Sequence, residues 1–200
     1  VKHFMASVME FLDGGLGALD TPMSELSAIP ADTRRLLLAE RNDTDRPLDP
    51  ERVIDDIEGW ARSAPERMAV TSDAGSLSYG DLWSASERIA RRLRAQGVER
   101  GSFVGLSSRR TPGMVAALLG IWRAGAAYLP LDPEFPEDRL AFMVADSGAP
   151  VILTDDARRV PETDAAVLDL GDDASVPWDG ELPASNGDDL AYIIYTSGST

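Results

Sequence analysis

The middle of the chain alternates between two kinds of segment, and this alternation limits the possible folds more than any other feature. Short apolar runs with the length of buried strands are separated by longer runs with helical spacing. The strand-like runs are 102–107, 126–131, 151–154 and 166–170, and the helix-like runs are 111–122 and 136–144. Strands that are joined by single helices imply right-handed crossovers. We therefore predict an α/β fold with a mostly parallel sheet flanked by helices.

The stretch before this alternation predicts a helix, a hairpin and a second helix. Residues 51–64 have one apolar face, which Pro65 closes. A strand over 68–71, a turn at Asp73-Ala74-Gly75 and a strand over 77–79 indicate a hairpin. An amphipathic helix then begins at Asp81 and stops before Gly97.

This second helix carries several arginines, which allow two interpretations. They could mark an anionic partner, or they could form the solvated side of a helix whose C-terminal half favours cations. We expect the solvated side. The residues are Arg88, Arg91, Arg92 and Arg94.

The first 49 residues predict a short helical extension followed by a linker. The first helix-like pattern is expected to end at Gly14-Gly15, and a second short helix at Arg41. Residues 42–50 are polar and contain two prolines, as is typical of a linker. We therefore divide the chain into residues 1–49 and residues 50–200.

Charge and composition exclude several kinds of function. The formal net charge is −15, so nucleic acid and anionic membranes are unfavourable partners on average. The absence of cysteine excludes disulfides and thiolate metal sites. His3 is the lone histidine, so neither a histidine-based zinc site nor a Ser/His/Asp site is expected, and no metal ligand is assigned. Because no apolar run reaches transmembrane length and no secretory signal is visible, we expect a cytoplasmic protein.

The final residues join a strand-like run to a cluster of hydroxyl groups. Residues 190–195 are apolar and rich in isoleucine and tyrosine, as in a buried strand. Backbone N–H and side-chain O–H groups that follow such a strand can converge on the oxygens of a phosphate. An ordinary polar turn is the alternative interpretation. The candidate phosphate-binding residues are Thr196, Ser197, Gly198, Ser199 and Thr200.

This end of the chain resembles a known phosphate-binding loop. The run YTSGST at 195–200 is similar to the start of the loop of adenylate-forming enzymes, which comprise the adenylation domains of nonribosomal peptide synthetases, acyl-CoA synthetases and luciferases. It is not the mononucleotide-binding loop, because the chain has no Gly-Lys-Ser or Gly-Lys-Thr.

Two earlier runs extend the resemblance over residues 51–200. The run LSYGDL at 77–82 resembles the family signature L-[ST]-Y-x-E-L, with Asp81 in place of the glutamate. The run RAGAAYLPLDP at 123–133 resembles K-A-G-x-A-Y-[LV]-P-[LI]-D-P, with Arg123 in place of the lysine. The sequence of this run is more similar to that of amino-acid-activating domains than to that of acyl-CoA ligases.

The resemblance implies an amino-acid adenylating ligase of nonribosomal peptide and antibiotic biosynthesis, here the N-terminal part of its large subdomain. Such an enzyme uses ATP and Mg²⁺ to make an aminoacyl-adenylate and then loads the phosphopantetheine thiol of a peptidyl carrier protein. The five loop residues would bind the β- and γ-phosphates. No catalytic residue falls within this chain, because the family's lysines, ribose-binding aspartate and amino-acid pocket would lie beyond Thr200.

Residues 1–49 resemble the tail of a condensation domain with its connector, partly through Arg41-Asn42-Asp43-Thr44. A neighbouring condensation domain is therefore an expected partner, and a small MbtH-like protein is a further candidate. Two alternatives stay open, namely a fragment of an acyl-CoA ligase and a non-catalytic docking module. We expect the chain to be the front part of a longer polypeptide and to be inactive alone.

Overall fold

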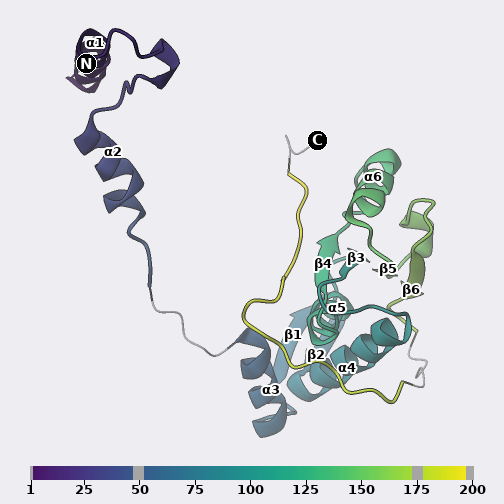
Figure 1. The fold of residues 1–200 in the computed structure, drawn as a ribbon. Helices are drawn as coiled ribbons and strands as arrows, with labels where there is room; N and C mark the ends of the chain where they lie inside the picture. Colours follow the sequence, from purple (N-terminus) through teal and green to yellow (C-terminus); the bar gives the residue numbers. More distant parts are fainter. Residues whose placement is uncertain (1, 47–51, 173–177, 197–200) are drawn as a thin grey trace. The chain divides into compact units, whose positions relative to one another are not determined.

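The computed structural model describes residues 2–46, 52–172 and 178–196, and the chain divides into two compact units, residues 1–49 and 50–200 (Figure 1). The described part of the first unit is helical. It contains the α-helices α1 (Lys2–Gly17) and α2 (Ala31–Leu38) and the 3-10 helices η1 (Met23–Glu25) and η2 (Glu40–Asn42).

The helix α1 does not end at Gly14-Gly15, where the sequence predicted its end, but continues to Gly17. A glycine inside a helix costs only about 1 kcal/mol, so two glycines weaken the helix without ending it. Large apolar side chains of this unit remain exposed, among them Phe4 at 70%, Leu16 at 75%, Met23 at 74% and Leu38 at 63%.

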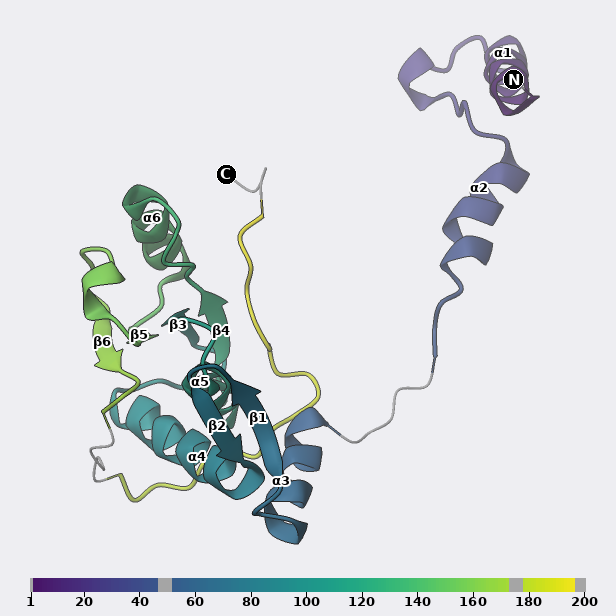
Figure 2. The ribbon, with the colours of Figure 1, turned by 180° about the vertical axis from the view of Figure 1, so that it is seen from behind.

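The second unit begins with α3 (Val53–Ser63), the antiparallel hairpin of β1 (Met68–Ser72) and β2 (Gly75–Ser78), and α4 (Tyr79–Ala95), which Figure 2 shows from behind. The helix α4 starts two residues before the predicted Asp81 because Ser78 caps it. The Ser78 hydroxyl accepts a hydrogen bond from the Asp81 N–H at 3.2 Å and lies 2.8 Å from its carboxylate. The run LSYGDL is therefore a strand end that turns into a capped helix.

A four-stranded parallel sheet confirms the predicted α/β class. The strands are β3 (Phe103–Ser107), β4 (Ala127–Pro130), β5 (Val151–Thr154) and β6 (Ala166–Asp169), in the order β4-β3-β5-β6. The helix α5 (Pro112–Arg123) connects β3 to β4, α6 (Glu137–Ser147) connects β4 to β5, and η3 (Ala157–Arg159) precedes β6.

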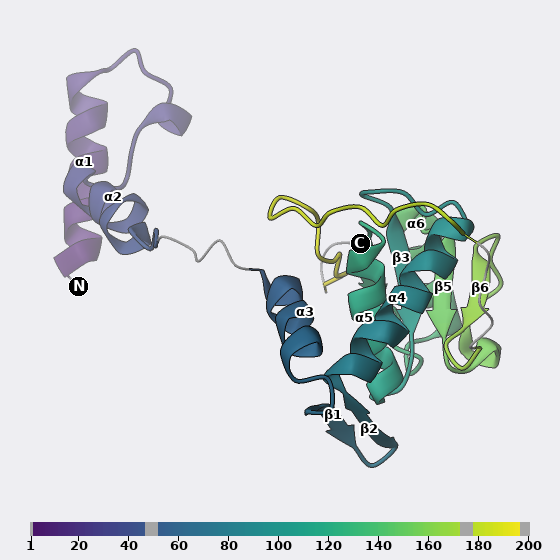
Figure 3. The same cartoon turned by 90° about the horizontal axis from the view of Figure 1, so that it is seen from below.

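Helices cover both faces of the sheet, and α4 and α5 lie together on one of them (Figure 3). Alternate strand residues point to opposite faces, so Val104 and Leu153 pack towards α4 and α5 while Leu129 and Ile152 pack towards α6. The helices α4 and α5 approach closely at Gly120, where a Cβ would lie 2.7 Å from Ile89 Cβ.

Candidate functional site

Residues 190–196 run along the free edge of β4. Tyr128 and Tyr192 form a parallel bridge, in which the Tyr128 N–H donates to Ala191 O at 3.2 Å and the Ile193 N–H donates to Tyr128 O at 3.0 Å. Because the direction is parallel, the segment leads to the carboxyl end of the sheet. Open α/β sheets bind ligands at that end.

This segment differs from the buried strand that the sequence predicted. It forms an isolated bridge and no regular strand among the described residues, and Leu190, Tyr192 and Ile194 are each more than half exposed. An edge position explains the difference, since only one side of the segment has a neighbouring strand within the described part of the chain.

Aromatic side chains secure the start of the segment. Trp122 Nε1 donates a hydrogen bond of 2.8 Å to Ala191 O. The Tyr128 ring lies between its neighbours, with ring-centre distances of 6.1 Å to Trp122 and 5.5 Å to Tyr192. Burial raises the pKa of the Tyr128 phenol, and the nearby Tyr192 raises it further, so Tyr128 is neutral at physiological pH.

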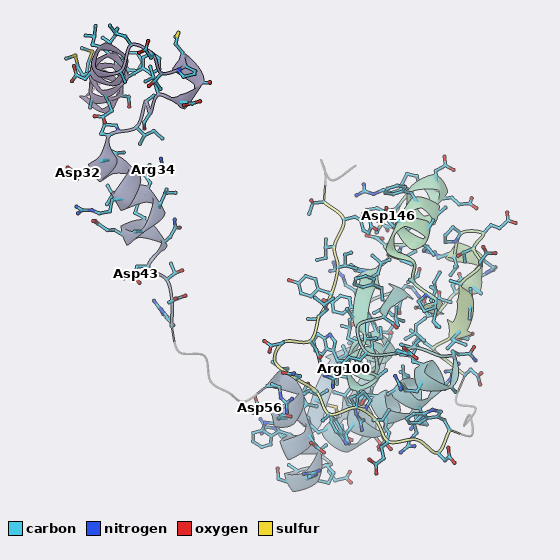
Figure 4. The ribbon with its side chains drawn as sticks, in the orientation of Figure 1. Asp32, Arg34, Asp43, Asp56, Arg100 and Asp146 are labelled. Atoms are coloured by element: carbon cyan, nitrogen blue, oxygen red, sulfur yellow. The ribbon has the colours of Figure 1, made fainter. Side chains whose placement is uncertain are left out.

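The end of the segment is attached to α6. Ile193 and Tyr195 share one side of the extended chain and pack against the core under α6. The Tyr195 hydroxyl donates to Asp146 Oδ2 at 2.6 Å, and the Tyr195 ring meets Phe142 edge-on at 6.1 Å. Burial and the contact with Asp146 raise the pKa of Tyr195 to about 12. Figure 4 labels Asp146 on α6.

The return connection, residues 170–189, brings the chain from β6 to the opposite edge of the sheet. The structure describes residues 170–172 and 178–189 of it. Arg92 holds its start: this side chain is 7% exposed, and its Nη1 donates to Asp169 O at 3.0 Å and to Asp172 O at 2.7 Å. The prediction that Arg92 lies on a solvated helix face is therefore wrong.

Further arginines contact the rest of the return connection. The guanidinium carbons of Arg91 and Arg94 each lie 5.8 Å from the centre of the Trp178 ring. Arg100 donates to Asp189 Oδ1 at 3.0 Å and also to the Ala184 carbonyl (Figure 4). Arg52 reaches the Ser185 carbonyl from the start of α3. These arginines thus hold the return connection on its path towards β4. Their contacts within the chain account for their presence without an external anion.

Of the predicted phosphate-binding residues, Thr196 is described and the others are not. Thr196 is exposed, directly after Tyr195, at the carboxyl end of the sheet. A hydroxyl group can donate a hydrogen bond to a phosphate oxygen, so the predicted role of Thr196 stays a prediction. Ser197, Gly198, Ser199 and Thr200 lie outside the described residues, so their role stays a prediction.

Two side chains of the site were not singled out from the sequence. Trp122 gives no signal beyond its place in an apolar helix. Asp146 does give one, because an acidic residue in the last turn of a helix opposes the macrodipole. Such a residue suggests a partner outside the helix.

The part of the chain that the structure describes supplies two negative findings. None of its helices is both long and apolar enough to cross a membrane. Within the same ranges, no group of three or more histidine, aspartate or glutamate side chains is arranged to hold a metal ion.

Comparisons with known proteins agree with this geometry. A family model described as AMP-binding enzyme matches residues 57–200. Bacitracin synthase 3 of Bacillus licheniformis is 40% identical over 182 residues, and gramicidin S synthase 2 of Brevibacillus brevis is 33% identical over 206. These alignments cover 90% and 100% of this chain but only 3% and 5% of the two relatives.

Solved structures show the same fold. The nonribosomal peptide synthetase FmoA3 in its AMPPNP-bound form matches with a TM-score of 0.71 and 29% identity, over 96% of this chain and 22% of that one. The N-terminal subdomain of NpsA from Klebsiella oxytoca matches with a TM-score of 0.66 and 25% identity, over 76% of this chain and 40% of that one. The chain is thus similar to a small part of much longer proteins.

Proposed function

The chain belongs to the AMP-binding enzyme family, and we propose that it is the front part of an adenylation domain that activates an amino acid with ATP. The observation that carries this proposal is the path of residues 190–196 along β4, which delivers Thr196 to the carboxyl end of the parallel sheet. Similarity to synthetases of peptides supports an amino acid, rather than another carboxylic acid, as the substrate of this chain.

In the proposed reaction, a carboxylate oxygen of the amino acid attacks the α-phosphorus of ATP. The bond to the bridging oxygen breaks, so the products are an aminoacyl-adenylate and pyrophosphate. The thiol of a carrier protein's phosphopantetheine then attacks the acyl carbonyl, and AMP leaves. These steps depend on positioning and charge neutralisation.

Within this chain, Thr196 and the loop residues after it would hold the β- and γ-phosphates through hydroxyl and N–H donors. Mg²⁺, when bound, would neutralise phosphate charge. We assign no ligand for Mg²⁺ to this chain. We also propose that the protein is located in the cytoplasm, where ATP and carrier proteins are present.

Residues 1–49 support a second, docking role beside the enzyme. Several large apolar side chains among the described residues 4–46 are exposed, and Phe4, Met5, Met9 and Leu12 have exposures between 50% and 70%. Apolar groups in this arrangement suit a protein surface that covers them. We propose a neighbouring condensation domain as that surface, while an MbtH-like protein is a further candidate partner of the second unit.

Amino-acid-dependent exchange between ATP and pyrophosphate tests the proposed enzyme in the full-length protein. We expect the wild type to show exchange with one amino acid of a complete set. Thr196→Ala should reduce it at least several-fold, since a hydrogen bond to a charged group contributes about 1.5–3 kcal/mol.

Thr71→Ala is the matched control, because it removes an exposed hydroxyl from the hairpin. Its exchange rate should equal that of the wild type. A folded wild type without exchange for any amino acid would exclude the proposed activity. Equal rates for Thr196→Ala and the control would show that Thr196 belongs to an ordinary turn.

A further inference from the structure

Two pairs of arginines follow the two central strands of the parallel sheet. Arg109 and Arg110 come directly after β3, and Arg158 and Arg159 lie in and at the end of η3, shortly after β5. The strands β3 and β5 are neighbours and run in the same direction (Figure 3). Both pairs therefore emerge at the carboxyl end of the sheet, and these four residues are called the arginine surface below.

The path of the chain reverses at this place. β3 connects through α5 to β4 on one side, whereas β5 connects through η3 to β6 on the other side. Open α/β sheets bind ligands outside the carboxyl ends of the strands at such a switch point. Neighbouring strands lie about 5 Å apart, so β5 lies only about 15 Å from residues 190–196 on the far side of β4.

Ion pairs join the two pairs of arginines without neutralising them. Arg109 donates from its backbone N–H and its Nε to Asp155 Oδ2, at 3.1 and 3.2 Å, and so links the loop after β3 to the loop after β5. Asp156 contacts both Arg158 at 2.9 Å and Arg159 at 3.5 Å. Two carboxylates thus face a larger number of guanidinium groups, and positive charge remains.

The arginine surface is open to solvent. The exposed fractions of the side chains of Arg109, Arg158 and Arg159 are 72%, 90% and 50%. Arg110 is also exposed, and it has no ion pair with a residue that the structure describes. A guanidinium has five N–H donors, and one carboxylate uses two of them in a bidentate pair. These arginines therefore retain donors for a partner, unlike Arg92, which is 7% exposed and donates within the chain.

The surroundings of the arginine surface are acidic. The chain has a formal net charge of −15. Asp132 and Glu134 follow β4, and Asp172 follows β6. The arginines thus form a basic strip over the two central strands, between acidic loops on the outer strands. A partner with a small acidic face fits this pattern, whereas nucleic acid or an anionic membrane would also meet the acidic loops.

We propose that the arginine surface docks an acidic face of the carrier protein while its thiol takes up the acyl group. This proposal rests on the proposed adenylation function. The thiol has to reach an adenylate at the carboxyl end of the sheet, so the carrier protein has to bind close to that end. Charge complementarity there guides the encounter and selects the orientation of the carrier protein.

The test uses the full-length protein in its apo form, so that only a separately supplied carrier protein can be loaded. Arg110→Glu and Arg158→Glu each reverse one charge, and a combined variant reverses both. Arg110→Lys and Arg158→Lys are the conservative variants, because they keep the charge. Arg62→Glu is the matched control, since Arg62 lies on α3 and its side chain is 76% exposed in its ion pair with Glu58.

We expect the combined variant to raise the KM for the holo carrier protein about ten-fold, because like charges then face each other. The lysine variants and the control should keep the KM of the wild type. Exchange between ATP and pyrophosphate and the Tm should not change in any variant. Fluorescence anisotropy should show the same loss of affinity for the apo carrier protein, and the loss should become smaller as salt is added.

Three results would overturn this proposal. One is an unchanged KM for the carrier protein in the combined variant, and another is an equal rise in Arg62→Glu. The third is a loss of affinity for the holo carrier protein alone, which would place the phosphate of phosphopantetheine on the arginines. A wild type that binds the carrier protein through this surface but shows no exchange for any amino acid would contradict the proposed function and still support the docking surface.

Discussion

The guanidinium of Arg123 stacks on the ring of Trp83, with its central carbon 3.7 Å from the ring centre, and so joins α5 to α4. Arg123 Nη1 also donates to Trp83 O at 2.7 Å and to Ser86 Oγ at 2.8 Å, and Nη2 lies 3.3 Å from the Glu87 carboxylate. The side chain is 10% exposed. Arg123 stands in place of the lysine in the family signature that residues 123–133 resemble. Its planar guanidinium with several donors suits these partners.

We expect Arg123→Lys to lower the free energy of unfolding by about 1–2 kcal/mol, because an ammonium cannot stack and donate in the same way. Urea unfolding followed by circular dichroism measures the change. Arg158→Lys is the control, since Arg158 is 90% exposed in its ion pair with Asp156 and should have no effect. Equal stability of all three proteins would mean that the stacking is incidental.

The ion pairs of Glu87 predict a dependence of stability on pH. Burial acts to raise the pKa of this carboxyl, but Arg91 and Arg123 outweigh it, so the pKa lies below its usual range. The unfolded state then binds more protons, and the stabilisation present above an unfolded pKa of about 4.3 is lost as the pH falls.

In Glu87→Gln this loss should be absent, so its free energy of unfolding should fall less steeply with acid than that of the wild type. Urea unfolding at a series of pH values from neutral to acid measures both slopes. Parallel curves would contradict the prediction. Asp32→Asn is a suitable control, because Asp32 is exposed and its contact with Arg35 is 3.9 Å long.

Arg92 predicts a link between stability and the return connection. Arg92→Met keeps the apolar stem but leaves the Asp169 and Asp172 carbonyls without their donor. We expect a loss of about 1.5–3 kcal/mol, together with faster thermolysin cleavage within residues 170–189. Arg62→Met removes a solvent-exposed guanidinium and should change neither quantity. Unchanged cleavage in Arg92→Met would show that other contacts suffice.

The fourth prediction is that the two units fold independently and are joined by an exposed linker. A polar, proline-containing linker implies that limited proteolysis cuts between residues 43 and 50. Deletion of residues 1–41 from a complete adenylation domain should leave the unfolding of that domain cooperative. The same deletion should abolish binding to a condensation domain, measured by pull-down. Loss of cooperative unfolding would instead place the first helices in the core of the second unit.

Much of the sheet could be predicted because local signals there agree with the final packing. The apolar runs of strand length in the middle of the chain all form strands, of which β5 is buried throughout while β6 is partly exposed. The glycines at 125 and 148 lie just past the ends of α5 and α6, with positive φ angles of 82° and 63°. The crossover rule then fixed the parallel direction of the strands. Each of these inferences uses residues that are close in sequence.

The arginines and the edge segment could not be predicted in the same way. Whether Arg92 meets water or protein depends on where residues 169–172 lie, far from it in sequence. The apolar residues at 190–195 suggest a buried strand, but the position at the edge of the sheet leaves the side chains of Tyr192 and Ile194 exposed. The pairing of Tyr195 with Asp146 likewise joins distant residues, and only the position of an acid at a helix end pointed to it.

The pairing of Tyr128 with Tyr192 also sets an order of events during synthesis of the protein. The ribosome synthesises β4 before residues 191–193. Until those residues are made, the N–H and carbonyl groups of Tyr128 lack the partners that they have in the folded protein. Closing so long a loop is slow compared with forming the neighbouring helices. During that interval the nascent chain offers a strand edge on which another chain can pair. That interval lasts at least as long as the synthesis of residues 131–193, because the segment that covers the edge of β4 is made last.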